Sequence, residues 1–370
     1  HVGDASLVIE VCNHLLSPER KQAFGDELKK SYALIRKNHL ENKNTVSNLV
    51  SYEQAMTQSF KTNWDQIEIA KPSRTGVFNL HFSLEEIVPY IDWSPFFWTW
   101  ELKGSYPKIL GHATIGTEAQ KLFNDAQILL KDIIANKRFS PKAVVGIFPA
   151  FSDGDDVIIE KNAHTKTTLH FLRQQKEKIG DERVYYSLAD FIAPSKTYLD
   201  SIGGFAVTTG HEVESFAKTF QDKHDDYSAI MVKAIGDRLA EALAELTHKK
   251  VREIFSFGLT EDLSNEDLIK EKYRGVRPAP GYPACPDHTE KQILWDLLDA
   301  ESHTQITLTE NFAMNPPSSV SGFYFNHPQA RYFNVGNLGE DQIESYAQRK
   351  GMDKATIEKW LSPNLDYEPN

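Results

Sequence analysis

Residues 277–291 read RPAPGYPACPDHTEK, and the first ten of them contain four prolines and one glycine. Because each proline fixes φ and lacks an N–H, neither a helix nor a strand ladder can continue through this segment. Gly281 permits a turn or a close approach of another group to the backbone. We therefore expect a stiff, irregular strap, residues 277–286, whose backbone N–H and C=O groups are free for a partner. Composition alone favours a rigid linker over a ligand-binding loop, so the rest of the chain has to decide.

The overall composition is that of an ordinary globular protein, with 370 residues, 40% hydrophobic and 25% charged. No apolar run approaches the roughly 18 residues of a membrane span, and no signal peptide opens the chain. The two cysteines, Cys12 and Cys285, lie far apart, which argues against a disulfide framework and favours a cytoplasmic setting. The net charge of −11 argues against nucleic acid or an anionic membrane as a partner.

Helices and strands are clustered rather than strictly alternating, which favours an α+β fold with a largely antiparallel sheet. We expect a helical part over residues 1–38, a polar, aperiodic linker over 39–80 and one main domain over 81–370. The expected strands are an aromatic one after a break at 92–95, then 144–150, 156–160, 184–193, 202–210, 306–314, 320–328 and 331–337. The expected helices include 4–16, 17–38, two pieces over 212–254, 288–299, 340–350 and 353–361.

The helix expected over 233–248 carries a row of carboxylates, with Asp237, Glu241 and Glu245 spaced four residues apart. For a lone helix, a solvated acidic stripe is the favoured interpretation. The alternative is that the row faces a cleft and meets a cationic ligand or a protonated imidazole. The sequence of the helix does not choose between them.

No metal site is predicted around Cys285 and His288, because one cysteine and one histidine are too few for a structural zinc ion. Asp287 and Glu290 instead fit a D-x-x-E capping box for the following helix. The sequence contains no G-x-S-x-G, P-loop or G-x-G-x-x-G motif. The pair Gly203-Gly204 in an expected strand is interpreted as a bulge or a close-packing site.

Several side chains could together recognise an amino-acid nucleoside. Arg277, at the head of the strap, is a planar cation suited to a carboxylate, and Tyr282 adds a phenol. Asp92 lies at a chain break, where a carboxylate could meet an ammonium group. Tyr332 and Phe333 offer a stacking face for a flat heterocycle. We therefore hypothesise that these residues are neighbours around a ligand with a carboxylate, an ammonium group and an adenine.

Much of the chain resembles the activation domain of cobalamin-dependent methionine synthase, continuously over about residues 80–370. Residues 4–17 look like the last helix of that enzyme's cobalamin-binding domain, whereas the cobalt-ligand motif is absent, so we expect a C-terminal fragment. The segments that carry the resemblance are IDWSPFFWTWELKGSYPKIL (91–110), VVGIFPA (144–150), LADFIAP (188–194), HDDYSAIMVKAIGDRLAEALAE (224–245), GVRPAPGYPACPDHTEK (275–291), SVSGFYFNHPQARYFNVG (319–336) and KWLSPNLDY (359–367).

The resemblance implies a C-shaped α+β domain, with a twisted antiparallel sheet, that binds S-adenosyl-L-methionine in a shallow groove. The parent enzyme transfers a methyl group from methyltetrahydrofolate to homocysteine through cobalamin, and the activation domain supports reductive methylation of cob(II)alamin. Its implied partners are the cobalamin-binding domain of the same chain and a flavodoxin or flavodoxin-like reductase. A cytoplasmic monomer is expected.

The resemblance also assigns ligand contacts. Asp92 matches the position that holds the amino group, and Arg277 matches the one at the carboxylate. The strap residues Ala279, Gly281 and Tyr282 match further contacts.

Tyr332 and Phe333 match the last contact pair, although the family often has tyrosine at the second position. Phe333 therefore lacks a hydroxyl, which matters only if that contact is made by the side chain.

The candidates for catalytic roles are Tyr282, Glu241, Glu271 and Asp237. Glu241 and Glu271 match acidic positions near the reacting centre or the docking surface, and Asp237 matches a partner for the displaced cobalt-ligand histidine. Methyl transfer needs alignment rather than an acid or base, in keeping with the missing catalytic motifs. Two rival readings are a docking module for the reductase and the cobalamin domain, and a free-standing methyltransferase, which the absence of a base disfavours.

Overall fold

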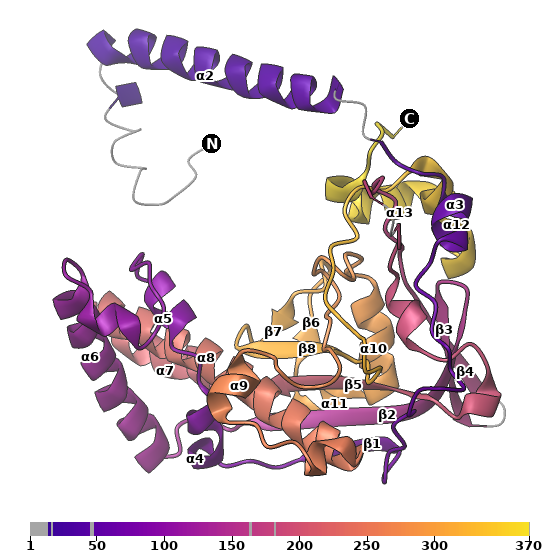
Figure 1. Cartoon of the computed structure of the whole chain (residues 1–370). Helices are drawn as coiled ribbons and strands as arrows, with labels where there is room; N and C mark the ends of the chain where they lie inside the picture. The colour runs from indigo at the N-terminus through magenta and orange to yellow at the C-terminus, as the bar shows by residue number, and fades with distance from the viewer. Residues whose placement is uncertain (1–13, 16–17, 45–47, 163–164, 181–182, 370) are drawn as a thin grey trace. The chain divides into compact units, whose positions relative to one another are not determined.

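The computed structural model describes residues 14–15, 18–44, 48–162, 165–180 and 183–369 (Figure 1). The chain divides into two units, residues 1–49 and 50–370. The first contains helix α2 (Pro18–Asn44), which confirms the helix expected from Pro18 and extends it beyond residue 38. The helix expected over 4–16 lies outside the described residues, apart from His14 and Leu15, which are helical.

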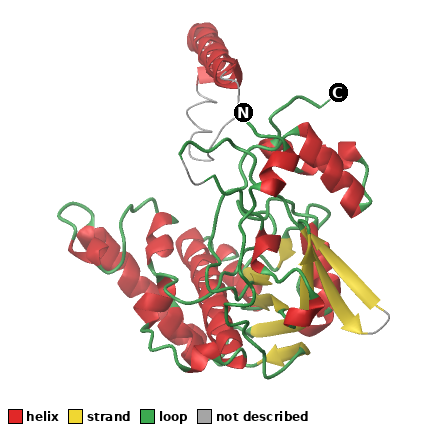
Figure 2. Ribbon diagram, turned by 45° about the vertical axis from the view of Figure 1, so that its right-hand side comes forward, coloured by secondary structure: helices red, strands yellow, loops and turns green. Residues whose placement is uncertain are grey.

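The second unit is built on an antiparallel sheet, drawn as yellow arrows in Figure 2. Its spatial order is β4 (Thr165–His170), β3 (Asp156–Asn162), β2 (Lys142–Asp153), β5 (Ser201–Thr208) and β8 (Ser319–Tyr324), and β1 (Gly76–Leu80) pairs with β2. Strands β6 (Thr307–Leu308) and β7 (Met314–Asn315) form a separate pair. All these pairings are antiparallel, which confirms the expected sheet type.

The helices form two hydrophobic cores with the sheet and a third near the C-terminus. One core joins Val145 and Phe205 of the sheet to α6 and α8, and another joins Val144 and Ala206 to α10. The third joins α12 and α13, which lie together in Figure 1. The helices are α3 (Tyr52–Thr57), α4 (Leu84–Ile87), α5 (Ser94–Trp98), α6 (Gly116–Ala135), α7 (Glu212–Gln221), α8 (Asp226–Ile254), α9 (Asn265–Ile269), α10 (Glu290–Leu298), α11 (Ala300–Thr304), α12 (Glu340–Lys350) and α13 (Lys354–Trp360).

Two glycines let α10 pack closely on the sheet. Gly146 of β2 and Gly204 of β5 are direct partners in the strand register. A Cβ at Gly204 would lie 2.6 Å from Leu294 Cδ1, and one at Gly146 would lie 2.7 Å from Leu298 Cδ2. Both distances are far below van der Waals contact, so a side chain at either position would push the helix away. The close-packing interpretation of Gly204 is thereby confirmed.

Several sequence-based expectations differ from the structure. The aromatic segment after Asp92 is helix α5 rather than a strand, because Pro95 in its first turn favours a helix start. Residues 184–193 form isolated bridges and a short 3₁₀ helix, and 331–337 form no strand. Part of the segment expected to be a linker, 39–80, contributes α3 and β1 to the second unit.

The two helices expected over 212–254 and those at the C-terminus are confirmed. None of the described helices is both long and apolar enough to span a membrane.

Candidate functional site

A cavity of about 420 Å³ lies between the strap, β8 and α8. It brings together seven of the predicted site residues: Glu241, Glu271, Arg277, Ala279, Tyr282, Tyr332 and Phe333. Its wall also includes Ser319, Val320 and Ser321 of β8 and Phe205 of β5. The volume falls in the range of small-molecule sites, and the mixture of aromatic rings and charged groups suits a polar ligand with a flat ring.

The strap begins along the free edge of β8, the last strand of the sheet. Val276 and Phe325 exchange two backbone hydrogen bonds of 3.0 Å, and the Phe323 N–H donates to the Pro278 carbonyl at 2.8 Å. A Cβ on Gly322 would lie 2.8 Å from that carbonyl oxygen, so only glycine permits this approach. Prolines are tolerated here because an edge segment needs no outward N–H. The strap head is therefore fixed to the sheet.

The strap then turns on itself. Gly281 has a φ of +94°, and a Cβ there would lie 2.2 Å from the His288 ring. Its N–H donates to Cys285 O at 2.7 Å, and the Cys285 N–H donates to Tyr282 O at 2.9 Å. The expectation that the strap's backbone groups are free is thus wrong for most of the turn. In the described part of the chain, no group accepts a hydrogen bond from the Ala279 N–H, and Ala279 lines the cavity.

Arg277 presents a guanidinium group at the cavity wall. Its Nη1 donates to Glu245 Oε2 at 2.6 Å and to the Tyr273 hydroxyl, and its Nη2 lies 3.8 Å from Glu271 Oε1. Burial alone would favour a neutral arginine, but Glu245 and the neighbouring acidic and phenolic groups together outweigh burial, and the pKa of Arg277 is raised. The group therefore remains a cation while half-buried.

The acidic row of α8 is divided by the fold. Asp237 and Glu241 are exposed, as the solvated-stripe interpretation expects, and Asp237 accepts a hydrogen bond from Ser318 Oγ at 2.7 Å. Glu245, one turn further on, is 4% exposed. Burial raises the pKa of Glu245, an effect that Arg277 opposes. Sequence reasoning did not single out Glu245, whose only signal was its place in the row.

Three predicted site residues do not line the cavity. Gly281 shapes the turn behind it, and Asp237 lies on α8 one turn before Glu241. Asp92 Oδ1 accepts a hydrogen bond of 2.9 Å from the Ser94 N–H at the start of α5. Its observed partner is therefore the backbone of its own segment.

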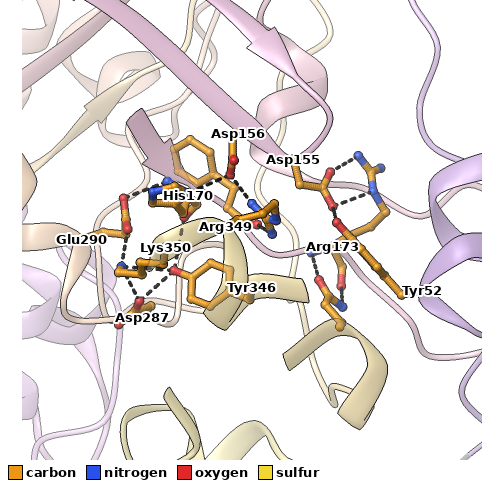
Figure 3. A network of polar contacts seen from close by, with 12 residues as sticks. Tyr52, Asp155, Asp156, His170, Arg173, Asp287, Glu290, Tyr346, Arg349 and Lys350 are labelled. Carbon is orange, nitrogen blue, oxygen red and sulfur yellow. Dashed lines mark hydrogen bonds and ion pairs between the residues drawn. The ribbon is translucent and has the colours of Figure 1, made fainter. Parts of the chain in front are cut away.

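Asp287, the residue directly after the strap, belongs to a buried polar network that anchors this end of the strap (Figure 3). Asp287 accepts hydrogen bonds of 2.7 Å from Lys350 Nζ and from the Tyr346 hydroxyl. Lys350 also pairs with one oxygen of Glu290. The other Glu290 oxygen accepts a hydrogen bond of 3.1 Å from the backbone N–H of His170. The expected capping box is wrong, because the N-cap of α10 is Thr289 and Asp287 and Glu290 do not form the reciprocal pair. Asp287 accepts the backbone N–H of Thr289 at 2.8 Å, but both carboxylates pair mainly with Lys350 at the end of α12. Burial raises the pKa of Asp287, but Lys350 and the hydrogen bonds from Tyr346 and Thr289 together lower it by more, so the carboxyl stays ionised.

The network continues to the strands and α3. Asp156 accepts from His170 Nδ1 at 2.9 Å and pairs with Arg349. Beside it, Asp155 pairs with the fully buried Arg173 and accepts from the Tyr52 hydroxyl at 2.9 Å. Helix α12, strands β3 and β4 and the segment before the main sheet are thereby linked through charged groups (Figure 3).

An antiparallel α+β fold whose cavity is walled by an arginine, carboxylates and aromatic rings defines the class: a small-molecule-binding domain. The family model described as vitamin B12-dependent methionine synthase, activation domain, matches residues 83–351. A crystal structure of the MetH reactivation domain bound to AdoHcy is similar to this chain, with a TM-score of 0.84 and 48% identity. The match covers 86% of this chain and 99% of that one. The chain belongs to the family of vitamin B12-dependent methionine synthase activation domains, which confirms the resemblance and the fold class.

Proposed function

We propose that this chain binds S-adenosylmethionine in the cavity under the strap and supports the reductive methylation of cob(II)alamin in methionine synthase. The observation that carries the proposal concerns Arg277. Its cationic side chain is paired with the buried Glu245 and lies at the wall of a cavity that Ala279, Tyr332 and Phe333 also line. The related MetH reactivation domain carries AdoHcy, which has the same amino-acid and adenosine groups.

Each predicted site residue then has a role that its chemistry supports. Arg277 pairs with the ligand's carboxylate, and the Ala279 N–H donates to the ligand. Tyr332 and Phe333 face the adenosine end, where an aromatic surface stabilises a flat ring. Gly281 and Tyr282 complete the strap side of the site. Asp92 is proposed to hold the amino group through its second oxygen, since the Ser94 N–H occupies Oδ1.

The acidic residues suit the charge of the reacting centre. Glu241 and Glu271 line the cavity as exposed carboxylates, so they stabilise a positive sulfonium more than a neutral thioether. Asp237 lies one turn from Glu241, where a protonated histidine of the cobalamin-binding domain could pair with it. When bound to that domain, cobalamin would supply the cobalt nucleophile. The contribution of this chain is to hold and orient the methyl donor.

Calorimetric titration with S-adenosylmethionine tests the proposal. The wild-type chain is expected to bind saturably, and Arg277→Ala is expected to abolish binding because the carboxylate loses its cation. Arg138→Ala, which removes a surface arginine paired with Asp132 outside the cavity, should bind as the wild type does. No binding by the wild type would refute the proposal.

The same variant addresses the docking-module alternative. If the chain serves mainly to dock a flavodoxin-type reductase and the cobalamin-binding domain, Arg277→Ala should spare reductase binding while the wild type binds the nucleoside weakly or not at all. The proposal also includes a reductase partner, a monomeric state and a cytoplasmic location. A binding assay tests the first, sedimentation the second and cell fractionation the third.

A further inference from the structure

Arg277 is held from behind by buried groups that do not line the cavity. Its Nη1 donates to Glu245 Oε2 at 2.6 Å and to the Tyr273 hydroxyl, and lies 3.4 Å from His248 Nδ1. Glu245 and His248 are 4% and 1% exposed. An Nη nitrogen carries two N–H groups, so these contacts use its whole donor capacity on the protein side.

The opposite edge of the guanidinium is open. Nη2 lies 3.8 Å from Glu271 Oε1, a distance beyond a hydrogen bond, and Arg277 lines the cavity. A carboxylate entering the cavity could therefore take the outer N–H groups without displacing Glu245. The inner contacts thus determine which edge of the arginine the ligand meets.

Glu245 is the group that keeps this orientation. Among the described residues it supplies the close carboxylate on the inner side, whereas Glu271 supplies one on the outer side. His248 cannot replace it, because burial and the neighbouring Arg252 and Arg277 lower its pKa and leave it neutral. Without Glu245, the nearest remaining anion is Glu271, and the guanidinium would turn into the space that a ligand carboxylate needs.

The second oxygen of Glu245 supports a role other than stability. Oε1 is buried and has no hydrogen-bond partner among the described residues. A carboxylate that is only half satisfied in a buried place costs stability compared with an apolar side chain of the same size. Its position is explained if its charge is used to hold Arg277.

We infer that Glu245, assisted by Tyr273, is the positioning residue for the carboxylate-binding arginine, and that it confers selectivity for ligands that carry a carboxylate. The inference rests on the proposed function, since it concerns the same cavity. Glu245 does not touch the ligand and acts through Arg277.

The test compares two ligands on one variant. Glu245→Gln keeps the side-chain shape and removes the charge. Calorimetric titration with S-adenosylmethionine is expected to show binding at least about tenfold weaker than in the wild type. Decarboxylated S-adenosylmethionine keeps the sulfonium, the amine and the adenosine, so its affinity should be the same for both proteins. Glu253→Gln, the same substitution at a partly exposed position of α8 where Glu253 pairs with Lys250, is the matched control and should alter neither affinity.

The outcomes separate the inference from the proposed function. If the variant loses affinity for both ligands equally, Glu245 has only a structural role and the inference is overturned. Unchanged binding of S-adenosylmethionine also overturns it. If the wild-type chain binds neither ligand, the proposed function itself fails and the inference falls with it.

A second variant keeps the test decisive if Glu245→Gln does not fold. Tyr273→Phe leaves the ion pair intact and removes the hydrogen bond that Arg277 donates to the Tyr273 hydroxyl. We expect a loss of about threefold in affinity for S-adenosylmethionine and none for the decarboxylated ligand. Equal losses for the two ligands, or no loss for either, contradict the inference.

Discussion

The hydroxyl of Tyr332 accepts a hydrogen bond of 3.1 Å from the backbone N–H of Arg277, 55 residues earlier in the chain. Tyr332 is 44% exposed and lines the same cavity as Arg277. One side chain thus offers its ring to the cavity and its oxygen to the head of the strap. This links the residue proposed at the ligand's carboxylate with one proposed at its adenosine end.

Tyr332→Phe is expected to loosen the strap head while retaining the ring. A hydrogen bond of this kind contributes about 0.5–1.5 kcal/mol, and partial exposure places Tyr332 at the lower end. Thermal unfolding should therefore show a small decrease in Tm. Tyr282→Phe is the matched control for stability, because no described residue forms a hydrogen bond with the Tyr282 hydroxyl. Equal Tm values for the wild type and Tyr332→Phe would contradict the assignment.

Lys350→Met is expected to destabilise the protein strongly. It leaves Asp287 and Glu290 buried without their cation, and breaking a buried pair in this way costs about 3–5 kcal/mol. Urea unfolding monitored by circular dichroism measures the change. Lys218→Met is the comparison, since its pair with Asp222 is exposed and worth about 0.5 kcal/mol or less. Similar values for the two variants would show that the network in Figure 3 contributes no more than a surface pair.

His327 is expected to make stability depend on pH. Its Nδ1 accepts the Gln329 N–H at 3.0 Å, and Nε2 lies 3.0 Å from Thr62 Oγ1. Burial and the nearby Arg274 lower the pKa of His327 to about 4 from an ordinary 6.5. Between these values the unfolded chain binds the extra proton and the folded chain does not, so the free energy of unfolding falls as pH falls, by up to about 3 kcal/mol.

The effect of His327 can be isolated by denaturant unfolding at several pH values. In His327→Asn this contribution should disappear, so the difference in unfolding free energy between the two proteins should vary between pH 6.5 and 4 and stay constant above pH 7.5. A constant difference over the whole range would rule out a titrating His327.

Gly204→Ala tests the contact between α10 and the sheet. The new Cβ would lie 2.6 Å from Leu294 Cδ1, and overpacking of a core typically costs about 1–3 kcal/mol. Gly111→Ala provides the control, because a Cβ at Gly111 has nothing within 4 Å. Chemical unfolding of both variants measures the difference. Equal stability would mean that Leu294 can move aside at little cost.

Elements with a long periodic pattern could be predicted from the sequence. The two helices over 212–254 and those ending the chain have enough repeats of the apolar spacing to define their type. The predictions for short segments were less accurate. The aromatic residues after Asp92 are typical of strands, yet Pro95 starts helix α5, and residues 184–193 pair only at single bridges. Local preference in such segments is weak enough for tertiary packing to override it.

By itself the sequence determined the irregular strap, its rigidity and the residue types that suit an amino-acid nucleoside, because prolines, glycines and charges act within a few residues. Only the tertiary structure decided which charges are paired. Glu245 meets Arg277 across 32 residues, and Asp287 meets Lys350 across 63. Local spacing predicted a solvated stripe for Glu245 and a helix cap for Asp287. The reason is that a buried charge pairs with a group from another element that packs against it. The spacing of residues along one segment does not indicate which elements pack together.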